Sequence, residues 1–99
     1  MKNPSDFAAL MTKRINFGGA NDQLLRVVEG GSAPEALDLA TDLTLAVEEL
    51  SHRLDFSVNG VGDPVSCVEL RALAFLSGTA ASLLQSVRYA VKDQKERTL

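Results

Sequence analysis

The sequence predicts an all-α protein built around a long antiparallel helical hairpin. Two apolar-striped segments, residues 33–56 and 64–93, make up more than half of the 99 residues, and each begins with a helix start signal. The seven residues between them, 57–63, are rich in glycine, and so short a connection forces the two helices to run in opposite directions. We expect one domain that spans residues 1–99.

The first long helix starts at the sharpest local signal in the chain, Ser32-Ala33-Pro34-Glu35. This is an S-x-x-E capping box, in which the serine hydroxyl and the glutamate carboxylate each accept a hydrogen bond from a free backbone N–H. Pro34 has no N–H to leave unpaired in the first turn. Apolar residues then recur at alternating spacings of four and three, which predicts one packed face: Ala36, Ala40, Leu43, Val47, Leu50 and Leu54.

The second long helix begins after Asp63-Pro64, a capping residue followed by proline. Between Leu70 and Leu84 it is apolar on nearly every side, which is typical of a helix covered by more than one partner. Small residues around Gly78 indicate either the close approach of another backbone or a kink in the helix. Residues 94–99 are polar, and we expect them to fray.

A short helix is expected ahead of the hairpin, over residues 4–14. Asn3-Pro4 has the form of a helix start, because proline suits the first helical position. Apolar side chains follow at helical spacing: Phe7, Leu10, Met11 and Ile15. Paired glycines, Gly18-Gly19, then predict a turn that ends the helix.

The segment 21–29 is ambiguous between strand and helix. Its leucines and valines fit one helical turn, but β-branched Val27 and Val28, followed by Gly30-Gly31, favour extended structure. A lone strand in a helical protein has to pair with a copy of itself or lie against the helices.

Composition places the chain among folded proteins with a core of small side chains. The hydrophobic fraction is 45%, aromatic residues make up 5% and tryptophan is absent. Cys67 is the only cysteine, which favours the cytoplasm over an oxidising compartment. The longest apolar run, residues 72–76, is far shorter than the roughly 20 residues of a membrane span, so we expect a soluble cytoplasmic protein without a membrane partner.

The charge is concentrated in the middle of the chain. The net charge is −3, yet from Glu29 to Glu69 nine acidic residues face a single base, Arg53. An acidic middle repels phosphate and argues against direct binding of nucleic acid. It is either a surface for a basic partner or a solvated helix face whose acids are favoured by the helix dipole.

Self-association is expected from the size of the hairpin. About 55 residues of paired helix bury little apolar surface, at roughly 25 cal/mol per Å². Ordering each residue costs about 1–2 kcal/mol of chain entropy. A homodimer would place four helices around one core and supply the missing burial. We therefore expect a four-helix-type bundle formed by two copies.

Few residues carry the chemistry that catalysis needs. His52 is the only histidine, and Glu48 lies four residues before it, but a zinc site normally takes three or four ligands. A Cys67–His52 pair across the hairpin is the one nucleophile and base that the sequence offers. Small helical hairpins lack a cleft for substrate, so we expect no enzyme activity, no metal site and no cofactor.

The chain also resembles a family of small uncharacterised bacterial proteins, common in pseudomonads, that carry a domain of unknown function. The matching pattern is Leu25-Arg26-Val27-Val28, then Gly30-Gly31, then Glu35-Ala36-Leu37 at the start of a helix, followed by a second helix rich in leucine and alanine. The likeness covers about Leu24 to Val91. It implies a helical fold and supplies no activity.

We expect the protein to act by binding another protein, as a regulator or inhibitor of the kind found among phage-encoded inhibitors and toxin immunity proteins. The expected surface combines acids with apolar side chains: Asp38, Asp42, Leu45, Glu49, Leu70, Leu73 and Leu84. The alternative is an oligomeric binder of a small anionic ligand such as a nucleotide. In that case Lys13, Arg14 and Arg26 would gather with the glycine segments at a subunit boundary.

Overall fold

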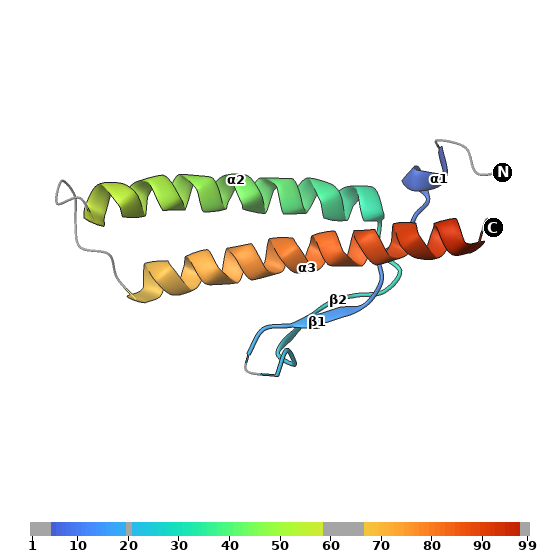
Figure 1. Ribbon diagram of the computed structural model, residues 1–99, viewed down its shortest axis with the longest axis horizontal. Helices are drawn as coiled ribbons and strands as arrows, with labels where there is room; N and C mark the ends of the chain where they lie inside the picture. Colours follow the sequence, from blue (N-terminus) through green and yellow to red (C-terminus); the bar gives the residue numbers. More distant parts are fainter. Residues whose placement is uncertain (1–4, 20, 59–66, 98–99) are drawn as a thin grey trace.

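The computed structural model describes residues 5–19, 21–58 and 67–97, with side chains at 7–19, 21–54 and 68–97. Two long helices dominate this part of the chain and lie antiparallel, side by side, with a small β hairpin against α3 (Figure 1). The elements in order are α1 (Ser5–Ala8), β1 (Ile15–Phe17), β2 (Leu25–Val27), α2 (Ala33–Val58) and α3 (Cys67–Arg97).

The prediction of an all-α fold is wrong. Residues 15–17 and 25–27 form an antiparallel two-stranded sheet, in which Ile15 pairs with Val27 and Phe17 with Leu25. The prediction of a short N-terminal helix over residues 4–14 is also wrong. The helix α1 is a single turn that ends at Ala8, and the chain is extended from Met11 to Phe17. The ambiguous segment 21–29 therefore contains a strand, and it pairs with its own chain.

Tertiary hydrogen bonds explain why the apolar spacing of residues 7–15 did not produce a helix. Thr12 is 4% exposed, and its N–H donates to the carbonyl of Gly31 at 2.8 Å. The Thr12 hydroxyl donates to the Val28 carbonyl at 2.6 Å and accepts from the N–H of Gly31 at 2.9 Å. The first of these bonds occupies the backbone N–H that a helix would use, and together the bonds tie the extended segment to the residues just before α2.

A glycine turn closes the β hairpin. Gly18 and Gly19 have φ angles of +82° and +75°, which residues with a Cβ rarely adopt. The N–H of Gln23 donates to the carbonyl of Gly18 at 3.0 Å. A Cβ on Gly19 would also lie 2.9 Å from Cγ of Leu24, so the exposed Leu24 side chain would have to shift. The predicted turn is therefore present, although it joins two strands.

Ser32 caps the start of α2, as the serine part of the predicted capping box requires. The N–H of Glu35 donates to the Ser32 hydroxyl at 3.3 Å, and the N–H of Ala36 donates to the Ser32 carbonyl at 3.0 Å. The six residues of the predicted packed face are all buried or half-buried. The expected connection 57–63 lies mostly outside the described residues. At the other end α3 stays helical through Arg97, whose guanidinium pairs with Asp93 at 3.0 Å, where fraying was expected from residue 94.

The buried core is small and rich in alanine. Its apolar members are Val27, Ala33, Ala36, Ala40, Leu54, Ala80, Leu83, Val87 and Ala90. The molecule extends over 57 × 29 × 18 Å with a radius of gyration of 16.9 Å, against about 13 Å for a compact chain of this length. Its accessible surface is 7207 Å², against about 5,500 Å² for a typical folded monomer of 10.6 kDa. The helices and the hairpin thus form one thin layer.

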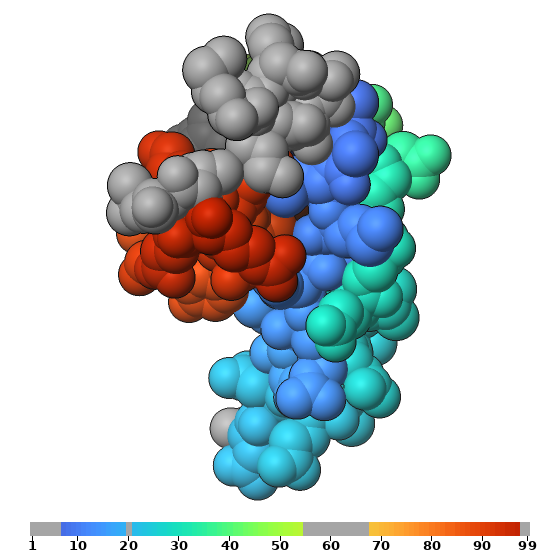
Figure 2. Space-filling model, turned by 90° about the vertical axis from the view of Figure 1, so that its right-hand side faces the viewer, coloured from blue at the N-terminus to red at the C-terminus, as the bar shows by residue number. Residues whose placement is uncertain are grey.

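The extended segment crosses α3 on one side only. The fully buried Ser86 hydroxyl accepts from the N–H of Lys13 at 2.8 Å and donates to the Lys13 carbonyl at 2.5 Å. Figure 2, where blue marks this segment and red the C-terminal half of α3, shows the two in contact and the strands projecting beyond the helices. The opposite side of α3 carries no such cover from residues 10–17.

Gly78 is expected to reduce the stability of α3, and its replacement by alanine should restore that stability. It lies inside the helix, and a Cβ at this position would meet nothing within 4 Å, so the close approach considered for the small residues does not occur in this chain. Gly78→Ala should stabilise the fold by about 0.5–1 kcal/mol, because alanine has the higher helix propensity and restricts the unfolded chain. Urea denaturation would measure this change. A loss of stability would show that the position needs glycine.

By length and composition alone, α3 also meets the requirement for a membrane span over Val68–Arg97. The core helix of a soluble protein passes the same test. Only 28% of the most apolar stretch of this helix is buried in the fold, so much of its apolar surface is available to something outside the chain.

Candidate protein-binding surface

A shallow groove runs between α2 and α3 on the side away from the extended segment. It has a volume of about 210 Å³ and is lined by Ala40, Thr41, Thr44, Leu45 and Leu84. Leu84 and the buried Ser86 lie two residues apart on α3, which turns their side chains about 200° from each other at 100° per residue. Because Ser86 holds the extended segment, Leu84 points to the uncovered side. We call this side of the layer the groove face.

The leucines predicted for an interaction surface gather on the groove face. Leu45 and Leu84 line the same groove from different helices and are 56% and 47% exposed. Leu70, 52% exposed, and Leu73, half-buried, precede Leu84 on α3 by 14 and 11 residues. These spacings correspond to whole numbers of turns, so the three leucines form one stripe. The groove face is therefore apolar beyond the groove itself.

Charged side chains border the groove face on both helices. The predicted acids Asp38, Asp42 and Glu49 are all exposed, and their spacing with Leu45 is 4-3-4, which places all four along one edge of α2. Arg88 is exposed one turn after Leu84 on α3. Near the start of α2 and the end of α3, the rim on α2 is therefore acidic and the rim on α3 is basic.

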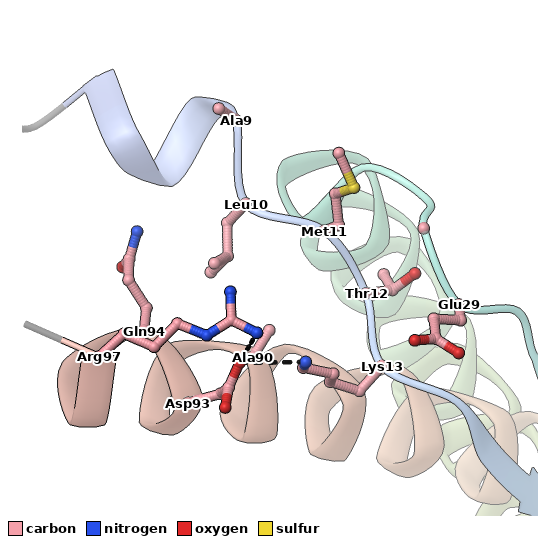
Figure 3. A pocket seen from close by; sticks show the side chains of 11 residues that line it. Ala9, Leu10, Met11, Thr12, Lys13, Glu29, Ala90, Asp93, Gln94 and Arg97 are labelled. Atoms are coloured by element: carbon pink, nitrogen blue, oxygen red, sulfur yellow. Dashed lines mark hydrogen bonds and ion pairs between the residues drawn. The ribbon is translucent and has the colours of Figure 1, made fainter.

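The three basic residues of the alternative function do not come together. Lys13 lines a separate cavity of about 370 Å³ near the C-terminal end of α3, and its Nζ pairs with Oδ2 of Asp93 at 3.1 Å (Figure 3). Arg14 follows Lys13 in extended chain, so its side chain points the opposite way. Arg26 is exposed and turned away from its buried neighbour Val27.

The same cavity contains its own counter-charges. Asp93 accepts from Lys13 and from Arg97, as the dashed lines in Figure 3 show, and Glu29 adds a second carboxylate to the lining. Two cations and two anions leave the lining neutral. An anionic ligand would have to displace the carboxylate that already holds both cations.

The residues considered for catalysis are placed only in part. His52 is exposed in the last turns of α2. Cys67 begins α3, but its side chain lies outside the described residues, so the Cys67–His52 pair remains a prediction. Among the residues described, no group of three His, Cys, Asp or Glu side chains lies where it could hold a metal ion.

Sequence reasoning missed three residues of the groove and its rim. Thr41 and Thr44 line the groove although they are polar. Each hydroxyl already donates to a carbonyl one turn earlier, that of Leu37 for Thr41 and that of Ala40 for Thr44. Arg88 could have been predicted from the sequence, because it lies four residues after Leu84 and so falls on the same stripe of α3.

The groove face is defined by exposure and geometry within this one chain. The resemblance to a family of bacterial proteins stays a prediction, as do the expected cytoplasmic location and the absence of a cofactor. No protein-family model, no curated protein and no solved structure matches this chain.

Proposed function

We propose that this chain is a non-enzymatic protein that acts by binding protein, as a regulator or inhibitor, and that the groove face is its docking surface. The observation that carries the proposal is the exposure of three leucines, Leu45, Leu70 and Leu84, on one side of a single layer. Isolated exposed leucines are common on protein surfaces, but a stripe that continues into a groove is typical of an interface.

The thin architecture supports the proposal. Stable domains normally bury apolar faces between at least two layers, and this chain supplies one. The extended segment covers part of one side near Lys13 and Ser86, whereas the described residues that line the groove come from α2 and α3 alone. A protein surface laid on the groove face would provide the second layer.

The rim charges favour a protein partner over a nucleic acid. Asp38, Asp42 and Glu49 would repel phosphate, but they would pair with lysine or arginine around an apolar centre. Protein interfaces have this arrangement, with apolar anchors in the middle and charges at the rim that set orientation and specificity.

Substitution of the groove leucines is expected to abolish docking while the fold survives. In the double variant Leu45→Ser/Leu84→Ser, both exchanged side chains are about half exposed, so the free chain should keep its helical circular dichroism. Capture of a protein partner from the lysate of the source cells, followed by titration with that purified partner, should show at least about a tenfold loss of affinity.

Leu39→Ser is the matched control for this experiment. Leu39 is also on α2 and is 49% exposed, but it lies about 120° around the helix from Leu45. The control variant should bind like the unchanged chain. Equal loss of binding in both variants would show general damage, and unchanged binding in the double variant would move the docking surface away from the groove face.

A small anionic ligand has weaker support, since the structure separates Arg14 and Arg26 from Lys13. A thermal-shift screen with nucleotides and inorganic phosphate tests this alternative directly, because a ligand that binds the folded state raises the melting temperature. We expect no shift. A rise of several degrees that Lys13→Met removes would favour the ligand-binding function.

A further inference from the structure

We infer that the occupant of the groove face is a second copy of this chain, related by a twofold axis that runs parallel to the helices. The inference rests on the proposed function, because it uses the same docking surface and names what lies on it. In this arrangement α2 of each copy packs across the groove face on α3 of the other, and Asp38 of each copy meets Arg88 of the other.

The surface area of the chain is suited to such a pairing. The accessible surface exceeds that of a typical folded monomer by about 1,700 Å². A standard interface removes about 800 Å² from each partner. A second copy on the groove face would therefore remove about half of this excess.

Charge decides between the two ways in which identical layers can stack face to face. If the twofold axis ran across the helices, α2 would lie on α2 of the other copy and α3 on α3. The acidic edges with Asp38, Asp42 and Glu49 would then face each other, and like charges placed opposite one another are destabilising. This arrangement is disfavoured.

An axis parallel to the helices brings opposite charges together. Rotation about this axis leaves equivalent residues of the two copies at the same height along the helix direction. It places α2 of one copy over α3 of the other. Ala36 and Ala40 share a core cluster with Leu83 and Val87, so this part of α2 lies level with this part of α3. Asp38 and Arg88 are therefore at the same level, on the edges that come together.

The same axis places apolar groups over the groove. Leu45, at the acidic edge of α2, would lie toward the leucine stripe on α3 of the other copy, close to Leu84. Thr41 and Thr44 leave the floor of the groove shallow, which allows a helix to approach. The result is a layer of helices on a layer of helices, the architecture of a four-helix bundle.

The purified full chain is expected to be a dimer of about 21 kDa, twice its 10.6 kDa, at low micromolar concentration in light scattering after size exclusion. The single variants Asp38→Arg and Arg88→Asp each turn two attractive contacts per dimer into two repulsive ones. Each should weaken self-association by about 30-fold at physiological salt. Mixed in equal amounts, the two variants should form a heterodimer, because both rim contacts then join opposite charges.

The outcomes separate the alternatives. The inference is overturned if the chain is a monomer at all accessible concentrations. It is also overturned if Asp38→Arg strengthens the dimer, because that result indicates that α2 of one copy faces α2 of the other. A dimer lost in Leu39→Ser and kept in Leu45→Ser/Leu84→Ser places the contact on the other face. A chain that floats with phosphatidylcholine vesicles and never dimerises assigns the apolar surface of α3 to lipid.

This test and the test of the proposed function can fail separately. A monomer whose groove face captures a different protein would overturn the inference and leave the proposed function standing. A dimer of the predicted charge pattern, together with partner capture that ignores the groove leucines, would uphold the inference and place the docking of a different protein on another surface.

Discussion

Ser86→Ala is expected to lower the free energy of unfolding by about 2–4 kcal/mol. Ser86 is 0% exposed, and its hydroxyl makes the two hydrogen bonds that join α3 to the backbone of Lys13. Alanine removes both bonds and leaves the N–H and the carbonyl of Lys13 without these partners in a partly buried position. An unpaired buried polar group costs about 1–3 kcal/mol. With a core made mostly of alanine, the fold has little other stability to offset this loss.

Ser82→Ala is the control for this change. Ser82 lies one turn earlier on α3 and is 5% exposed, but its hydroxyl donates to the carbonyl of Gly78 within the same helix. Its removal leaves no N–H unpaired, so we expect a loss below about 1 kcal/mol. Urea denaturation gives both values, and hydrogen exchange of the Lys13 amide should accelerate only in Ser86→Ala. Equal effects at the two serines would contradict the view that Ser86 holds the extended segment in place.

Leu83→Ala is expected to destabilise the fold by about 2–4 kcal/mol, close to the loss at Ser86. Leu83 is 8% exposed and belongs to the cluster that joins α2, α3 and the β hairpin through Ala36, Ala40 and Val27. Its truncation opens a cavity within this cluster, which the surrounding packed side chains can fill only in part. Few other side chains of this size are buried, so this site should dominate the packing energy.

The neighbouring residue provides the comparison. Leu84 is 47% exposed on the groove face, so Leu84→Ala should cost less than about 1 kcal/mol in the isolated chain. If the groove face binds a second copy, stability depends on protein concentration. Denaturation at two concentrations therefore separates the roles, because Leu83→Ala lowers stability at both and Leu84→Ala only at the higher one. A large loss at Leu84 in dilute solution would place it in the core.

Local signals predicted the helical part of the fold well. The capping serine, Ser32, and the four-and-three spacing from Ala36 to Leu54 describe α2, because both depend on residues within a few turns of each other. The same reasoning failed at residues 4–14. Their apolar spacing suits a helix, but Thr12 and Lys13 bond to Gly31 and Ser86, which are far away in sequence.

The sequence predicted leucines and acids of the candidate surface, but it did not predict the groove that the leucines help to form. Leu45 lies outside the predicted packed face of the first long helix, and the structure brings it together with Leu84 in one groove. Lys13, Arg14 and Arg26 were grouped by charge alone, and the structure separates them, since neighbours in extended chain point opposite ways and Asp93 already holds Lys13.

By itself, the sequence determined that two long amphipathic helices form, that the core between them is small, and that leucines and acids lie outside it. Periodicity, capping and composition are local properties, so they can be read without the fold. Only the tertiary structure decided that residues 10–17 are extended and that this segment covers only one of the two faces of the described helices. Both outcomes depend on hydrogen bonds and contacts between segments that are distant in sequence, such as Lys13 and Ser86, which are 73 residues apart, and no local pattern encodes them.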